Sequence, residues 1–185
     1  MSQQLAVSML GSPSMELDGA PLVFPYRQAE AILYYLFLNQ SVNKYTLADL
    51  IWEDKCTEEK TNSNLRNAFY IIRKNLGKDF LVKGSGDMIK ITPAFSLTLD
   101  TEQFLREEQN LSLYRGDFLE GFYLKNNVSF NEWVTNTRQV FKAHYLKSCT
   151  GPSLLTLTPG ISSFANPSAI NRCRSMNSMR PHTNI

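Results

Sequence analysis

The side chains best placed for chemistry lie in the stretch TNSNLRNAFYIIRKNLG, residues 61–77. Asn and Arg can form two hydrogen bonds at once with the edges of adenine and guanine, and Lys, Arg and Tyr bind phosphates. This combination suits contacts with a nucleic acid. The candidates for reading bases are Asn62, Ser63, Arg66 and Asn67, and those for contacting phosphates are Lys60, Tyr70, Arg73 and Lys74.

A helix over residues 61–76 would hold these side chains on one surface. Apolar residues recur at steps of three and four, which predicts an amphipathic helix; they are Leu65, Ala68, Phe69, Ile72 and Leu76. At about 100° per residue, the opposite face carries Lys60, Ser63, Asn67, Tyr70 and Lys74, with Arg66 and Arg73 on its flank. Gly77 ends the helix. Taken by itself, such a polar face is more often simply solvated.

The segments around this helix change that interpretation. Residues 80–93, FLVKGSGDMIKITP, predict two strands joined by a Gly-Ser-Gly-Asp turn, with Lys83 and Lys90 on either side of it. A short helix ending near Trp52 is predicted before the long one, with Thr46 as N-cap and Asp49 as a capping-box partner. Short helix, turn, long helix and basic hairpin follow the order of a winged helix-turn-helix. The hairpin lysines are then candidates for the neighbouring DNA backbone or minor groove.

The N-terminal part predicts a small antiparallel sheet followed by a buried helix. Strands are expected at 5–10, 14–19 and 20–24, with a two-residue hairpin turn at Asp18 and Gly19. Residues 27–40 are apolar on most sides and predict a deeply buried helix. Beyond the basic hairpin, Asp100 is expected to cap a helix over 101–110, and residues 130–147 form a last packing helix.

Composition changes abruptly at residue 148. All 17 acidic residues and 16 of the 19 basic ones lie at or before Lys147, so the net charge of +2 comes from arginines in the tail. Global charge is therefore no argument for a nucleic-acid partner. The tail has four prolines, many Ser, Thr and Asn residues and no periodicity, which predicts disorder. A natural flexible tail and an out-of-frame end of a truncated gene both explain the change.

Other classes of protein find little support in the residues. The longest apolar run, 31–38, is far shorter than the roughly 20 residues of a membrane span, and no N-terminal signal precedes it, so we expect a cytoplasmic protein. Three cysteines without metal-ligand spacing suggest neither a zinc site nor a disulfide framework, and no cofactor motif is present. The two histidines, His144 and His182, are expected to pack or to be solvated. We expect no enzyme activity.

The chain resembles the SARP-type bacterial transcriptional activators, which join an OmpR-type winged helix-turn-helix to a bacterial transcriptional activator domain (BTAD). The resemblance covers roughly residues 5–147 and is most specific in LADLIW, in NLRNAFYIIRKNLG and in YRGDFL. It implies a four-stranded N-terminal sheet, a three-helix core and a C-terminal wing, with the helix near 61–76 in the major groove. It also implies direct-repeat promoter sites and contact with RNA polymerase.

We therefore expect an α+β fold in three parts. Residues 1–98 are a winged helix-turn-helix with an N-terminal antiparallel sheet, 99–147 are the first helices of a TPR-like BTAD that stops early, and 148–185 are the tail. The expected function is that of a DNA-binding transcriptional regulator acting on double-stranded DNA. The alternative is a protein-interaction module or a truncated fragment that no longer activates transcription. Dimerisation through apolar surface left by the shortened array is a further hypothesis.

Overall fold

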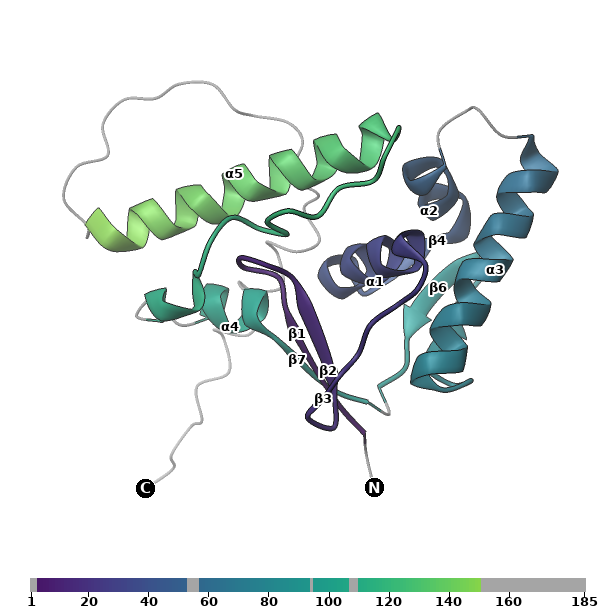
Figure 1. Ribbon diagram of the computed structural model, residues 1–185, viewed down its shortest axis with the longest axis horizontal. Coiled ribbons are helices and arrows are strands. Elements are labelled where there is room, and N and C mark those ends of the chain that lie inside the picture. The colour runs from purple at the N-terminus through teal and green to yellow at the C-terminus, as the bar shows by residue number, and fades with distance from the viewer. Residues whose placement is uncertain (1–2, 53–56, 94, 107–109, 151–185) are drawn as a thin grey trace, which may run out of the picture.

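Two sheets and five α-helices make up the computed structural model, which describes residues 3–52, 57–93, 95–106 and 110–150 (Figure 1). Residues 53–56 of the predicted turn between the short and the long helix, and residues 151–185 of the predicted tail, lie outside these residues. The elements are β1 (Gln4–Ser8), β2 (Ser14–Leu17), β3 (Ala20–Pro21), α1 (Arg27–Asn39), β4 (Ser41–Asn43), α2 (Lys44–Ile51), α3 (Glu58–Leu76), β5 (Leu81–Lys83), β6 (Met88–Ile91), β7 (Ser96–Leu99), α4 (Asp100–Arg106), the 3-10 turn η1 (Leu111–Leu113) and α5 (Val128–Thr150).

The first sheet has the strand order β3-β2-β1-β7. The predicted hairpin turn is present, because Asp18 and Gly19 both have positive φ, 51° and 80°. The three predicted strands pair antiparallel, as expected, and a fourth strand, β7, pairs with β1 in parallel. Parallel pairing needs a long crossover, and everything from β2 to β6 supplies it. The third strand is also shorter than predicted and consists of Ala20–Pro21 alone.

Helix α1 occupies the centre of the molecule, between the first sheet and the pair α2 and α3 (Figure 1). Its buried side chains surround most of the helix, as the sequence predicts; they are Ala29, Ala31, Ile32, Leu33, Tyr34, Leu36 and Phe37. A helix that is apolar on most sides can be stable only where neighbours cover it. In this position α1 is the support against which α2, α3 and the second sheet pack.

The second sheet, of order β4-β6-β5, contains a strand that the sequence did not predict. Strand β4 pairs antiparallel with β6 and leads directly into α2. The helix therefore starts at Lys44, and its N-cap is Asn43, whose Oδ1 accepts the Tyr45 N–H at 2.9 Å. The prediction of Thr46 as N-cap is wrong, because the strand pairing fixes the chain three residues earlier. The rest of this sheet is the predicted hairpin β5–β6.

Helix α3 begins at Glu58, three residues before the predicted start, and ends at Leu76. Leu65, Ala68, Ile72 and Leu76 are buried and Phe69 is partly buried, so the predicted apolar stripe faces the core. Gly77 follows with φ of 98°, a conformation that favours glycine and ends the helix. The stripe turns the opposite, polar side of α3 outward.

The C-terminal helices pack on the same core as the preceding elements. Phe104 of α4 and Phe130, Val134 and Phe141 of α5 belong to one cluster with residues of β1 and α1. Helix α5 runs from Val128 to Thr150, past both ends of its predicted range. The division of the chain at residue 98 stays a prediction. No helix within the described residues is long and apolar enough to cross a bilayer.

Asp100 does not act as the cap residue that the sequence predicts. It is the first residue of α4, and its carboxylate accepts hydrogen bonds from the backbone N–H groups of Met9 and Leu10 beyond the end of β1. Arg115 also donates to it, at 3.3 Å. The prediction of Asp100 as N-cap is therefore wrong, because partners distant in sequence take the carboxylate.

Asn127 joins the C-terminus of α2 to the N-terminus of α5 through side-chain hydrogen bonds. Its Nδ2 donates to the carbonyls of Leu50 and Ile51, at 3.0 and 2.8 Å, and its Oδ1 accepts the Phe130 N–H at 2.7 Å. One buried amide therefore satisfies the C-terminus of α2 and the N-terminus of α5, which meet in Figure 1.

Replacing Asn127 with alanine should lower the free energy of unfolding by about 2–4 kcal/mol, because it removes a cap and leaves buried carbonyls unsatisfied. Asn136, exposed on α5, is the matched control, and its replacement should change stability by less than about 0.5 kcal/mol. Urea denaturation followed by circular dichroism measures both. Equal effects of the two substitutions would contradict the bridging role of Asn127.

Candidate nucleic-acid interface

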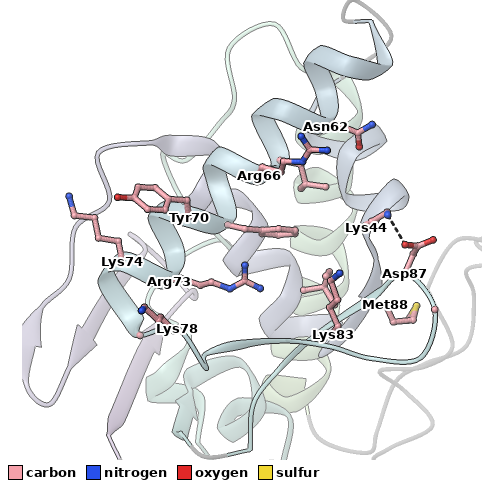
Figure 2. Close-up of a pocket in the computed structure, with 15 residues that line it drawn as sticks. Lys44, Asn62, Arg66, Tyr70, Arg73, Lys74, Lys78, Lys83, Asp87 and Met88 are labelled. Carbon is pink, nitrogen blue, oxygen red and sulfur yellow. Dashed lines mark ion pairs between the residues drawn. The ribbon is translucent and has the colours of Figure 1, made fainter.

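A groove of about 810 Å³ lies between α3 and the hairpin β5–β6 (Figure 2). The apolar stripe of α3 forms its floor through Leu65 and Phe69, and Ile89 of β6 contributes from the other side. The rim is strongly cationic. Its charged residues are Lys44, Arg66, Arg73, Lys74, Lys78, Lys83 and the acid Asp87.

The groove brings together six of the ten residues that the sequence predicts as a DNA-binding site. These are Asn62, Arg66, Tyr70, Arg73, Lys74 and Lys83. Five come from α3 and one from the hairpin, so residues from two separate elements line one hollow. Figure 2 shows Arg73 and Lys83 reaching into the hollow from its two walls, whereas Tyr70 and Lys74 point away from the hairpin.

The other predicted residues of α3 lie beside the groove. Lys60, Ser63 and Asn67 are exposed but do not line it. Arg66 and Tyr70 are exposed too, and they lie at the border between the groove and the solvent-facing side of α3. Helix α3 therefore presents a continuous polar surface, one part of which turns toward the hairpin while the other faces solvent.

The two hairpin lysines do not point the same way. Lys83 is opposite Ile89 in the β5–β6 register, and Lys90 is opposite Val82. Directly opposed residues of an antiparallel pair share a face, and neighbouring residues of a strand alternate. Lys83 therefore faces the groove with Ile89, whereas Lys90 lies on the other face of the hairpin and does not line the groove.

Arg73 lines the groove and also forms a hydrogen bond within the fold. Its Nη2 donates to the Leu81 carbonyl at 3.2 Å, which ties α3 to the first hairpin strand. The side chain is half-buried. A guanidinium has five N–H donors, so this bond leaves others free for an anion. Arg73 thus helps to hold the walls of the groove together and also contributes charge.

Sequence reasoning missed Lys44, Lys78 and Asp87. Lys44 is the first residue of α2, and its Nζ lies 2.6 Å from Asp87 Oδ1 in the hairpin turn (Figure 2). The hydrogen bond to Asp87 raises the pKa of Lys44. Only the pairing of β4 with β6 brings the two residues together. Because β4 was not predicted, nothing in the sequence indicated this contact, although Lys78 could have been found from its place just after the helix.

The local charge of the groove differs from that of the whole chain. Six cations and one carboxylate line it, whereas the chain as a whole has a net charge of +2. Cations gathered on a concave surface raise the local concentration of anions and speed their association. Chemically, the arrangement suits an extended polyanion that also offers hydrogen-bonding groups to the amides and guanidiniums of α3.

Comparison with solved structures gives a fold relationship. EmbR from Mycobacterium tuberculosis, solved in complex with a low-affinity phosphopeptide, matches with a TM-score of 0.60 and 19% sequence identity over 77% of this chain. The match covers 44% of the EmbR chain, so this protein spans less than half of that structure. No known family model and no curated protein matches the sequence. The similarity establishes a shared mixed α+β fold.

Proposed function

We propose that this protein is a sequence-specific, DNA-binding transcriptional regulator of the winged helix-turn-helix type. The observation that carries the proposal is the cationic groove between α3 and the hairpin, which six cations and one acid line. In this proposal α2 and α3 are the helix-turn-helix, and β5–β6 is the wing. Double-stranded DNA is the partner.

The dimensions of duplex DNA fit this arrangement. A major groove about 12 Å wide admits one α-helix, and α3 with its 19 residues is about 28 Å long. With the exposed side of α3 against base edges, the phosphate backbone that borders the major groove would run along the cationic groove. The wing would then meet the adjacent backbone or minor groove.

Each residue has a role that follows from its position. Asn67 and Ser63, on the solvent side of α3, are assigned to base edges, as are Asn62 and Arg66 at the border of the groove. Phosphate contacts are assigned to Lys60, Tyr70, Arg73, Lys74 and Lys83. Lys90, on the far face of the wing, is assigned to the backbone beyond it.

The fold similarity supports this proposal at a coarse level, because EmbR is a SARP-family transcriptional regulator. The activator role and contact with RNA polymerase belong to the proposal and rest on the resemblance to SARP-type activators. In the same proposal, α4 and α5 begin a TPR-like helical array, and the protein has no catalytic activity. The protein would act in the cytoplasm.

The alternative function is that of a protein-interaction module or of a truncated fragment that no longer activates transcription. Under that alternative the α3 surface would be solvated, and the cations would have no preference for duplex DNA.

Selection of bound duplexes from a random-sequence library, with the full chain as bait, tests the two proposals against each other. A DNA-binding regulator should enrich one motif over several rounds, since specific sites bind about 10³-fold or more tighter than other sequences. A folded protein that retains duplexes without enrichment has no sequence specificity. A folded protein that retains none at low salt is not a DNA-binding protein.

A further inference from the structure

The one acid among the groove residues lies at a place that suits a DNA phosphate. Asp87 Oδ1 is 2.6 Å from Lys44 Nζ, and Lys44 begins α2. Helix N-termini carry partial positive charge and bind phosphates and carboxylates alike. The two side chains are 34% and 45% exposed, so an anion from solvent can reach the same lysine.

The ion pair is not needed to hold the hairpin turn in position. The Lys44 N–H donates to the Asp87 carbonyl at 2.9 Å, and the Gly84 N–H donates to the Met88 carbonyl at 2.8 Å. Asn43 and Met88 are also paired in the β4–β6 ladder. These main-chain contacts fix the turn against the start of α2 whether or not the Asp87 side chain is charged.

We propose that the Asp87 carboxylate is an internal competitor of the DNA phosphate, so that Lys44 is a phosphate contact masked in the free protein. This inference rests on the proposed DNA-binding function. An exposed ion pair is weak, and a DNA phosphate surrounded by Arg66 and Lys83 would displace the carboxylate from Lys44. Breaking the Lys44–Asp87 ion pair offsets part of the electrostatic attraction between the protein and DNA. This cost is the same for every DNA sequence.

The consequence concerns the overall affinity for DNA and not the choice between sites. Sequence-independent binding depends almost entirely on phosphate contacts and on the counterions that they release. An acid that competes for one of these contacts therefore lowers affinity for all DNA equally. Selection between sites is then left to the side chains on α3, which contact bases.

The test compares the full chain with an Asp87→Asn variant, by fluorescence anisotropy on a mixed-sequence duplex of about 30 base pairs. The variant should bind about threefold to tenfold more tightly at about 0.1 M salt. The slope of log K against log salt should change by less than about 0.9, the value for one phosphate neutralised, because Lys44 meets the phosphate in both complexes. Asparagine keeps the shape of the side chain and the backbone bonds of the turn.

An Asp79→Asn variant is the matched control. It changes the net charge by the same amount, and Asp79 is exposed in the turn after α3 but does not line the groove. Its gain in affinity should stay below about twofold, because salt screens more distant charges. A gain as large as that of Asp87→Asn would show a general charge effect and overturn the proposal.

A Lys44→Met substitution in both backgrounds provides the second readout. It should weaken binding slightly in the natural protein, where Lys44 is paired, and more strongly in the Asp87→Asn background, where Lys44 is unmasked. If Asp87→Asn keeps its melting temperature and binds no tighter, the competition does not exist. If the natural protein also fails to bind duplex DNA at low salt, the proposed function fails with it, so the two failures are distinguishable.

Discussion

Replacing Arg66 and Asn67 together by alanine is expected to weaken binding to the selected DNA site by about 100-fold. Each well-oriented contact of such a side chain with a base edge contributes about 1–3 kcal/mol of discrimination, and about 1.4 kcal/mol corresponds to a factor of ten. Both side chains are exposed on α3. Their removal should therefore leave the fold intact, and melting temperatures would confirm this.

The comparison between two duplexes shows how these residues act. Anisotropy on the selected site and on a mixed-sequence duplex should show a much larger loss for the selected site, because Asn67 carries no charge. A Gln139→Ala, Lys142→Ala double variant removes an amide and a cation from exposed positions on α5 and should change neither affinity. Equal losses on the two duplexes would mean that the α3 surface binds phosphates without reading bases.

Asp100→Ala is expected to lower the free energy of unfolding by about 3–5 kcal/mol. The carboxylate is 7% exposed and accepts the Met9 and Leu10 N–H groups at 2.8 to 3.0 Å. Alanine would leave both donors buried without this acceptor. The substitution would also remove the hydrogen bonds that connect the residues after β1 to the start of α4.

Arg115→Ala provides the comparison for Asp100. The Arg115 side chain is 54% exposed, and its bond to Asp100 leaves the two backbone donors in place. Its loss should cost about 1 kcal/mol or less. Chemical denaturation of both variants measures the difference. If the two substitutions cost the same, the backbone contacts of Asp100 do not stabilise the fold as proposed.

Features encoded by neighbouring residues could be predicted from the sequence. The polar face of α3 opposite Leu65 and Ile72 follows from helical periodicity, and the hairpin around Gly86 follows from turn chemistry, so both were found in the structure. Six of the predicted site residues share the groove for the same reason. Local pattern was sufficient wherever one element carried the signal.

Features that depend on contacts distant in sequence could not be predicted. Strand β4 has only three residues and is defined by its pairing with β6, so no periodicity marks it. Without β4, the start of α2 at Lys44 and the ion pair with Asp87 were out of reach. The parallel pairing of β7 with β1 was missed for the same reason.

A salt series on the natural full chain with its selected duplex, followed by anisotropy, tests the proposed DNA interface most directly. Six cations line the groove, and if four or five neutralise phosphates, log K should fall linearly with log salt with a slope of about −4. Such a slope would support the groove as the path of the phosphate backbone. A folded protein that does not bind the duplex at low salt, or that binds it with an affinity independent of salt, would contradict the proposed interface.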